Sequence, residues 1–253
     1  MKRTLKQLLY GFFYLVILLA VVLGAYLLFF QKSSSCFDNI KNQDEVGIDC
    51  GGTCIDCDLK NVKDLIVQPA NIFDNGNSTS TILVVVLNPN KTLGIETLPY
   101  TIKLLNFEDQ EIYSVNRRAF SYPNQNKLLI EAGIDVEAIN IKQVLITLDY
   151  NRASWSKISP PPAQLADVAT RALGRHIEIT GRVINDNDYS LNQVAVVAIF
   201  SNKLGIKAAT SKTVIGEIKP FSFKAFQIVI PVKEEILSQI NLEEAFITLE
   251  AKR

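Results

Sequence analysis

Histidine and cysteine are scarce in this sequence, and their scarcity limits the chemistry that it can support. His176 is the only histidine among 253 residues, and all four cysteines lie between positions 36 and 57. These two residue types supply many of the acid–base groups and nucleophiles that work near neutral pH. The sequence also has no glycine-rich phosphate loop, no nucleophile elbow and no paired-histidine metal motif. These absences predict that the protein is not an enzyme.

A surplus of basic side chains is also missing. The sequence contains 26 lysine and arginine residues and 26 aspartate and glutamate residues. Nucleic acid binding depends on a basic surface that displaces the counterions of the phosphate backbone. We therefore expect no nucleic acid partner.

One long hydrophobic run stands near the N-terminus. Leu8–Phe30 has 23 residues and no charged side chain. As a helix it would reach roughly 35 Å, which is enough to cross a hydrocarbon core of about 30 Å. A cleaved signal peptide is the alternative, but its apolar core normally has only about 7–15 residues. The sequence therefore predicts an uncleaved transmembrane helix at residues 8–30, with the lipid bilayer as its first partner.

The charges beside this run predict its orientation. Lys2, Arg3 and Lys6 precede the run, and acidic residues dominate the stretch that follows it. Basic residues are retained on the cytoplasmic side of a membrane. We expect residues 1–7 to be cytoplasmic and the domains after the helix to be extracytoplasmic, in a single-pass protein of the plasma membrane.

The four cysteines fall in one short segment, residues 36–58, soon after the hydrophobic run. Outside the cytoplasm, clustered cysteines usually form disulfides, and four cysteines allow three pairings. The segment has too little apolar mass to fold by burial alone, so covalent closure would have to hold it. We expect a stiff, cysteine-rich collar in which every cysteine forms a disulfide: Cys36, Cys50, Cys54 and Cys57.

Two metal alternatives remain open for the collar. Oxygen-bearing side chains occupy the first, fifth, seventh and twelfth places of one window: Asp38, Asn42, Asp44 and Asp49. This spacing resembles a calcium-binding loop, so disulfides together with calcium are one alternative. Cys54 and Cys57 have the spacing of zinc ligands and of redox pairs, which gives the other.

The collar also resembles a known motif. The run Asp49-Cys50-Gly51-Gly52, followed by Cys54 and Cys57, is similar to a cysteine-rich motif of many secreted bacterial proteins. Asn39 stands where that motif has glycine. The resemblance implies a bacterial protein that works outside the cytoplasm.

The rest of the sequence is typical of β-structure. Runs rich in β-branched and aromatic residues are separated by turn residues, as in antiparallel sheets. Strands are predicted at residues 82–87, 100–105, 127–130, 144–148, 177–184, 194–200 and 225–230. Helical periodicity is limited to two short candidates, residues 165–173 and 234–240.

The two halves of this region align with each other. The segment 87–90 matches 184–187 at an offset of 97, and Pro123 matches Pro220 at the same offset. A repeat of about 95 residues fits a small antiparallel sandwich. A proline-rich stretch separates the copies and would act as a semi-rigid spacer. The predicted boundaries are a first β-sandwich at 59–158, a linker at 159–164 and a second β-sandwich at 165–253.

Each copy resembles a known domain family. The first, with an Asn88-Pro89-Asn90 turn between two strands, resembles the late-embryogenesis-abundant and water-stress (WHy) domain. The second, where Gly181, Val183 and Asn185 precede a valine-rich strand, resembles the bacterial FxLyD-type domain. The resemblance implies a mainly β fold with two tandem antiparallel sandwiches of the immunoglobulin or fibronectin III type. It implies no catalytic residues.

Other candidate residues have structural explanations. The turn Asn88-Pro89-Asn90 and the loop Asn185–Asp188 use residue types that favour tight turns. His176 is expected at the surface, and Trp155 is expected to pack near the boundary between the two copies.

These expectations lead to one function and two alternatives. We expect a non-catalytic, membrane-anchored binding or structural protein of the bacterial envelope, whose partner is another envelope protein or a surface polymer. Exposed strand edges or loops would make the contacts. The water-stress resemblance gives protection against desiccation or osmotic stress as an alternative. The spacing of Cys54 and Cys57 gives a thiol-redox protein as another.

Overall fold

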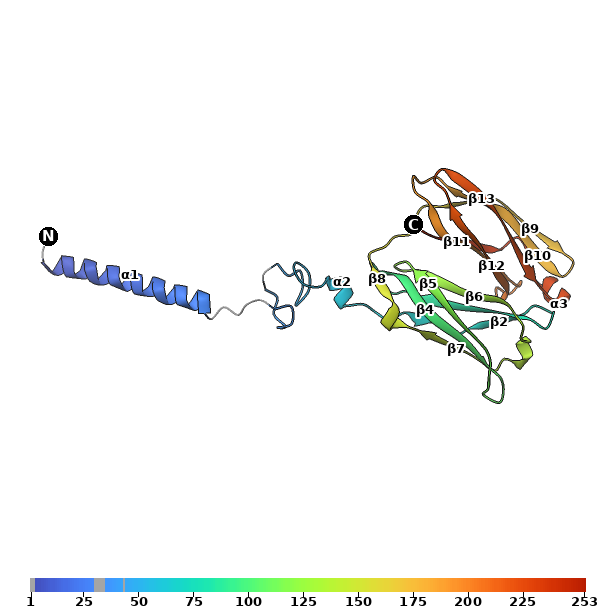
Figure 1. Ribbon diagram of the computed structural model, residues 1–253, viewed down its shortest axis with the longest axis horizontal. Coiled ribbons are helices and arrows are strands. Elements are labelled where there is room, and N and C mark those ends of the chain that lie inside the picture. The colour runs from blue at the N-terminus through green and yellow to red at the C-terminus, as the bar shows by residue number, and fades with distance from the viewer. Residues whose placement is uncertain (1–2, 30–34, 43) are drawn as a thin grey trace. The chain divides into compact units, whose positions relative to one another are not determined.

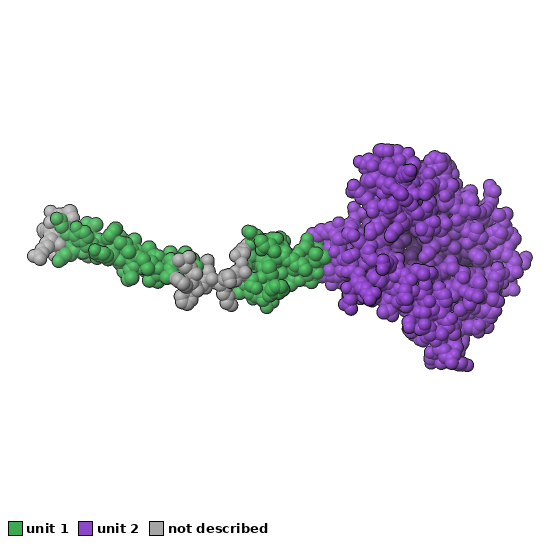
Figure 2. Space-filling model, in the orientation of Figure 1, with its two compact units in different colours: residues 1–61 green, residues 62–253 purple. Residues whose placement is uncertain are grey.

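The computed structural model describes residues 3–29, 35–42 and 44–253. The chain divides into two compact units, residues 1–61 and residues 62–253 (Figure 2). The first unit contains an apolar helix and the collar, and the second contains strands β1 to β14 (Figure 1).

The first unit begins with the apolar helix α1 (Arg3–Phe29). Within it, Lys6–Leu27 has 22 residues and a mean hydropathy of 2.5, so its length and composition suit a membrane span. An apolar helix near an N-terminus serves either as an anchor or as a signal sequence. The structure confirms an apolar helix over the predicted residues, and its role as an uncleaved membrane anchor stays a prediction. The expected end of the span, Phe30, and the orienting Lys2 lie outside the described residues.

The collar contains little regular structure. Its described part has one helical turn, α2 (Cys57–Lys60), whose N-cap Asp56 accepts a hydrogen bond from the backbone N–H of Asp58. Gly47 and Cys50 form an isolated antiparallel bridge. Turns account for most of the remainder, so packing of secondary structure cannot be what orders this segment.

The second unit is mainly β, and all of its paired strands are antiparallel. Three short helical turns interrupt the strands: η1 (Ala138–Asn140), η2 (Tyr150–Arg152) and α3 (Glu234–Leu237). The strands are β1 (Ile66–Val67), β2 (Asn71–Asp74), β3 (Ser80–Leu87), β4 (Gly94–Leu105), β5 (Glu111–Ser121), β6 (Asn126–Ile134), β7 (Gln143–Leu148), β8 (Ser154–Ser156), β9 (Gln164–Leu173), β10 (His176–Asn185), β11 (Leu191–Ser201), β12 (Lys207–Ile218), β13 (Ser222–Pro231) and β14 (Phe246–Lys252).

Strands β1 to β8 form two sheets, here called the first sheet pair. The outer sheet has the order β5-β4-β7, with β8 also paired to β4. The inner sheet has the order β1-β3-β2, with β6 also paired to β3. Between these sheets lies an apolar core that includes Ile82, Val84, Ile102 and Leu129. Strand β4 alternates buried and less buried residues, as expected for a strand with one face on a core.

Strands β9 to β14 form the second sheet pair. The inner sheet has the order β12-β11-β14, and the outer sheet has the order β13-β10-β9. Their shared core includes Ile179, Val196 and Phe200. Gly181 in β10 makes room for this packing, because a Cβ at that position would lie 2.7 Å from the ring of Phe226.

The two inner sheets pack against each other, so the sheets are layered in the order outer, inner, inner, outer (Figure 1). A third apolar cluster joins the two inner sheets through Phe73, Leu83, Ile130, Val197 and Ile199. Strand β3 is consequently buried on both faces, as its unbroken apolar sequence requires. In the second sheet pair, residues 194–200 of strand β11 are apolar and largely buried on both faces in the same way.

Each of the seven predicted strands lies inside an observed strand, but one predicted helix is wrong. Residues 165–173 belong to the edge strand β9, because pairing with β10 satisfies backbone groups that a helix would have paired internally. Tertiary pairing overrides the helical propensity of its alanine, leucine and arginine residues. The helix predicted at 234–240 is limited to α3. Strands β1, β2, β5, β8, β12 and β14 fall outside the predicted ranges.

Candidate functional site

The collar is closed by two disulfides, Cys36–Cys54 and Cys50–Cys57. The two closures interlock, since Cys50 lies inside the loop that the first disulfide forms. Cys54 and Cys57 are therefore not bonded to each other. A redox pair with this spacing normally forms its disulfide within the motif, so the pairing does not favour the thiol-redox alternative.

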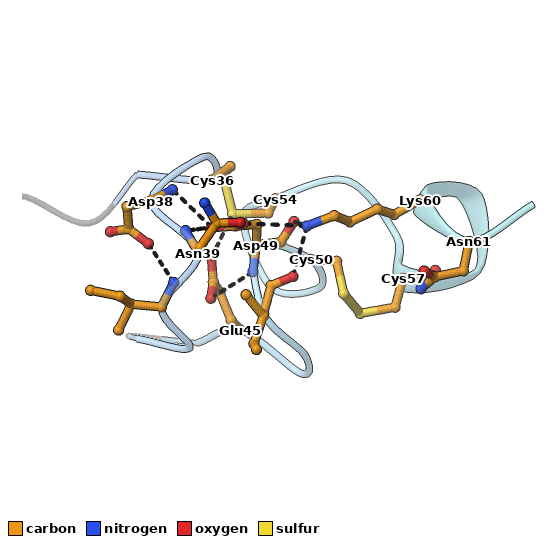
Figure 3. Close-up of polar contacts among 12 residues, drawn as sticks. Cys36, Asp38, Asn39, Glu45, Asp49, Cys50, Cys54, Cys57, Lys60 and Asn61 are labelled. Atoms are coloured by element: carbon orange, nitrogen blue, oxygen red, sulfur yellow. Dashed lines mark hydrogen bonds and ion pairs between the residues drawn. A yellow bond between two sulfur atoms is a disulfide. The ribbon is translucent and has the colours of Figure 1, made fainter.

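Two buried carboxylates organise the loop between the disulfides (Figure 3). Glu45 accepts hydrogen bonds from the backbone N–H groups of Asn42 and Asp49, both at 3.2 Å. Asp49 accepts hydrogen bonds from the backbone N–H groups of Asp38 at 3.0 Å and Asn39 at 3.1 Å. The collar thus uses charged side chains where a larger domain would use an apolar core.

Backbone geometry explains the residues of the motif. Asn39 has a φ of +58°, a left-handed conformation that asparagine tolerates better than most residues, so it can replace the motif's glycine. Gly52 has a φ of +61°, and a Cβ there would lie 2.4 Å from the carbonyl oxygen of Asp44. Glycine is required at that position by both conformation and space.

Three of the four predicted calcium ligands, Asp38, Asn42 and Asp49, take part in hydrogen bonds within the collar. Asp38 accepts hydrogen bonds from the backbone N–H of Ile40 and from the side-chain amide of Asn42. The hydrogen bond from Ile40 lowers the pKa of the Asp38 carboxyl below its ordinary value. Asp44 is exposed. The acidic groups of Asp38, Asp44 and Asp49 form no metal-sized cluster among the described residues.

A lysine ammonium supplies the positive charge beside Asp49. Lys60 Nζ lies 2.9 Å from the carbonyl oxygen of Ile48 and 3.4 Å from both a carboxylate oxygen and the carbonyl oxygen of Asp49 (Figure 3). These are the kinds of oxygen ligand that calcium would take. Lys60 therefore occupies the place beside Asp49 that a cation would take, whereas the side-chain oxygen of Asn42 is buried without a hydrogen-bond partner among the described residues. Calcium binding by the collar stays a prediction.

A zinc site is the second metal candidate, and its ligand chemistry rules it out. Glu45, Cys36 and Cys54 place one ligand atom each within 4.8 Å of one another. Zinc requires cysteine in the thiolate form. Both sulfurs are bonded to each other here, so neither is a thiolate.

The Asn88-Pro89-Asn90 turn is a buried hydrogen-bonded clasp. The Asn88 side chain donates to the carbonyl oxygens of Leu93 at 2.9 Å and Tyr122 at 3.0 Å, and it accepts from the backbone N–H of Asn90 at 3.0 Å. The Asn90 side chain donates to the carbonyl oxygen of Lys63 and accepts from its N–H. The clasp therefore fixes the chain that enters the first sheet pair.

The second sheet pair contains the same clasp. The Asn185 side chain donates to the carbonyl oxygens of Tyr189, Ile218 and Lys219, and it accepts from the backbone N–H of Asn187 at 3.1 Å. The Asn187 side chain donates to the carbonyl oxygen of Pro162 at 2.7 Å, which fixes the end of the proline-rich stretch. A binding role for either turn is not needed to explain its residues.

The contact between the inner sheets also contains charged groups. Lys127 Nζ lies 2.5 Å from the Glu250 carboxylate and 4.0 Å from the centre of the Phe120 ring. Lys127 and Glu250 are both almost fully buried. The Tyr122 hydroxyl donates to the carbonyl oxygen of Ala251 at 2.7 Å. Burial, together with nearby Glu250, raises the pKa of Tyr122 to about 12.

His176 and Trp155 occupy structural positions. His176 is half-buried at the start of β10, opposite Pro231 and Leu173 in the neighbouring strands. Trp155 in β8 packs against the core of the first sheet pair. Sequence reasoning missed the residues that join distant segments, namely Glu45, Lys60, Lys127 and Glu250. Nothing in the sequence indicates which of many charged residues will meet after folding.

Comparisons with known proteins do not assign a family. No protein-family model matches the sequence, and no curated protein matches it. Among solved structures, the chain is similar to a transglutaminase from red sea bream, with 9% sequence identity and a TM-score of 0.27. That similarity covers 76% of this chain and 30% of the transglutaminase chain.

The expectation that this chain is not an enzyme is corrected by that match, because the matched protein is an enzyme. The likeness is too low to indicate transglutaminase chemistry here. The expectation depended on short sequence motifs. Charged groups that are far apart in sequence can meet in the fold, as Lys127 and Glu250 do.

Proposed function

We propose that this chain is a single-pass protein of a bacterial plasma membrane that binds an envelope protein or a surface polymer outside the cytoplasm. In this proposal α1 is an uncleaved anchor with a cytoplasmic N-terminus. The collar is a covalently closed spacer, and the two sheet pairs are the binding region.

The observation that carries the proposal is the position of the disulfides. Both lie in the segment that follows an apolar helix. Disulfides persist in oxidising compartments and are rare in the cytosol. A helix that delivers this segment across the membrane accounts for both features.

The two asparagine clasps support a tandem of immunoglobulin- or fibronectin III-like sandwiches. Asn88 and Asn185 lie at equivalent places, and each accepts a hydrogen bond from the asparagine two residues later. The backbone N–H of Asn124 donates to the carbonyl oxygen of Asn90, as that of Phe221 does to Asn187. One ancestral unit, duplicated, explains why the same contacts recur at an offset of 97.

An open strand edge supports the binding role. Strand β9 ends the outer sheet of the second sheet pair, and it pairs only with β10 among the described strands. Such an edge can accept an extended segment of a partner by backbone hydrogen bonding. The loop around Phe221, an exposed aromatic residue, is the competing contact surface.

The location is tested by proteolysis of intact cells. Before digestion, the full-length chain should be found in the membrane fraction. Protease added outside the cells should then remove residues 62–253 and leave the helix in that fraction. Substituting Lys2, Arg3 and Lys6 with glutamate should reduce the cleaved fraction, because it removes the orienting charge. Full protection of the wild-type chain, or its release into the medium, would refute the proposal.

The binding role is tested by photo-crosslinking in cells. A photoreactive residue at Val168 probes the edge of β9, and one at Phe221 probes the loop. An adduct with an envelope protein or polymer at either position supports binding and identifies the surface. Absence of any adduct from both positions, in protein shown to be outside the membrane, argues against a binding role.

A further inference from the structure

A polar cleft lies beside the apolar contact of the two inner sheets. It has a volume of about 290 Å³, and strands from both sheet pairs line it. Tyr100 and Phe120 supply aromatic surface, while Arg118, Lys127, Lys212 and Glu250 supply charge. Clefts between domains are common places for small ligands.

The charges in this cleft do not cancel. Lys127 and Glu250 neutralise each other at 2.5 Å. Glu96, at the rim, accepts a hydrogen bond from the Ser156 hydroxyl at 2.7 Å. The side chains of Arg118 and Lys212 form no hydrogen bond or ion pair with any residue in the described ranges. The cleft therefore has two unpaired cations against one carboxylate.

Lys212 belongs to the inner face of β12. It lies opposite Val197 in the β11–β12 ladder, and cross-strand neighbours project from the same face of a sheet. Val197 is 1% exposed and belongs to the cluster that joins the inner sheets. The Lys212 stem therefore points toward the first sheet pair and into the cleft.

Burial of this lysine without a counter-ion is unfavourable. Burial lowers the pKa of Lys212, and nearby Glu131 and Glu250 oppose that effect while Lys127 and Arg117 add to it. Glu131 is already engaged by Arg117 through two hydrogen bonds, at 3.0 and 3.2 Å. An unpaired, partly buried ammonium is destabilising unless something neutralises it.

We propose that the cleft binds a small oxyanion, a carboxylate or phosphate group, through Lys212 and Arg118. An ammonium and a guanidinium are the groups that proteins use to hold such anions. Tyr100 and Phe120 would contact the body of a molecule that carries the oxyanion. The inference deepens the proposed binding role by naming a ligand class, and it depends only on residues 62–253.

The test uses the full chain in detergent micelles with three probes: inorganic phosphate, acetate and glucuronate, each at matched ionic strength against chloride. Calorimetry should detect binding of at least one probe. Comparison of the three probes shows whether the cleft prefers a phosphate, a simple carboxylate or an acidic sugar. Lys212→Met should weaken binding on the order of tenfold or more, because it removes a charge-assisted contact. Lys207→Met is the matched control, since Lys207 is an exposed lysine on the same strand, and it should leave binding unchanged.

A second readout needs no substitution. Reductive methylation with carbon-13 allows each lysine to be followed by NMR, and the bound oxyanion should raise the pKa of Lys212 but not that of Lys207. Binding of none of the three probes, or equal binding by the Lys212→Met and Lys207→Met variants, overturns the inference. Neither result bears on the membrane location, which the proteolysis experiment decides separately.

Discussion

The collar and the sheet unit, residues 35–61 and 62–253, keep their backbones ordered by different means. The buried residues described in the collar are Glu45, Asp49 and Cys50. Two carboxylates and one disulfide-bonded cysteine therefore take the place of an apolar core. The sheet unit instead buries two large apolar cores and a third apolar cluster between them.

This difference shows how chain length decides the mechanism of folding. A segment this short cannot bury enough apolar surface to offset its loss of conformational entropy. Covalent closure lowers the entropy of its unfolded state instead. The sheet unit is long enough to rely on burial, so conditions that disrupt one region should leave the other intact.

The largest expected structural change is the complete unfolding of the collar after removal of a disulfide, because the collar has no apolar core to hold it. Changing Cys50 and Cys57 to serine should abolish protection of the collar amides, because this disulfide closes a loop with a sequence separation of 7, and a loop of that size contributes roughly 2.5 kcal/mol. Hydrogen exchange measured by mass spectrometry would show this loss. The urea midpoint of the sheet unit should not change.

The control for that experiment is chemical reduction of the unaltered chain, which should reproduce the same pattern. Retained protection of the Glu45 and Cys50 amides after reduction would mean that the carboxylates alone hold the collar. A lowered urea midpoint of the sheet unit would contradict the independence of the two regions.

The next effect concerns the buried ion pair between the inner sheets. Glu250→Ala should lower the free energy of unfolding by about 3–5 kcal/mol, because it leaves the Lys127 ammonium buried without its partner. Replacing both residues, by Lys127→Met with Glu250→Leu, should cost much less or nothing. Urea denaturation followed by tyrosine fluorescence measures both.

Glu111→Ala is the matched control for this pair. Glu111 forms an exposed ion pair with Lys103 at 2.7 Å, and exposed pairs contribute about 0–1 kcal/mol. If the double replacement were as damaging as Glu250→Ala, the pair would be stabilising in itself, contrary to our expectation. Hydrogen exchange in the collar should be the same in all of these variants.

A smaller effect is expected from the asparagine clasps. Asn88→Ala and Asn185→Ala each remove a buried donor from two or three carbonyl oxygens, and each should cost about 2–4 kcal/mol. Asn106→Ala in an exposed turn is the control and should cost less than about 1 kcal/mol. Similar losses at Asn88 and Asn185 would support a duplicated unit, whereas a neutral result at either would count against it.

The clasps also show what the sequence can reveal. Asn88 and Asn185 were identifiable because the two turns have similar local sequences at an offset of 97, and their turn-forming chemistry is local as well. The strands β3 and β11 were identifiable for the same reason, since a long run of β-branched residues favours a strand wherever it lies. Local signals were sufficient for most of the fold.

The packing between the sheet pairs was not predicted, although a signal was present. An antiparallel strand with one solvent face alternates polar and apolar residues. Residues 82–87 and 194–200 do not alternate, so each must be buried on both faces. The proline-rich stretch between the copies suggested spacing instead. The charged partners Lys127 and Glu250 carry no comparable signal, because their meeting depends on the complete fold.

The smallest expected effect comes from an ion pair at the surface of the same contact. Lys233 Nζ of the second sheet pair lies 2.6 Å from the Asp74 carboxylate of the first. The hydrogen bond from Lys233 lowers the pKa of Asp74, and the hydrogen bond to Asp74 raises the pKa of Lys233. The stabilisation from Asp74 is therefore complete above its unfolded pKa of about 3.9 and is lost as the pH falls through the lower folded value.

The stabilisation from Lys233 has the opposite dependence on pH. It is complete below the lysine's unfolded pKa of about 10.4 and is lost as the pH rises through the higher folded value. Asp74→Asn should therefore slightly lower the urea midpoint of the sheet unit near neutral pH and have no effect in strong acid. Asp109→Asn is the matched control, because its pair with Lys142 has the same 2.6 Å length but lies within the first sheet pair. The comparison is the cooperativity of unfolding of the two sheet pairs. If Asp74→Asn and Asp109→Asn reduced it equally, the ion pair of Asp74 with Lys233 would not contribute to holding the two sheet pairs together.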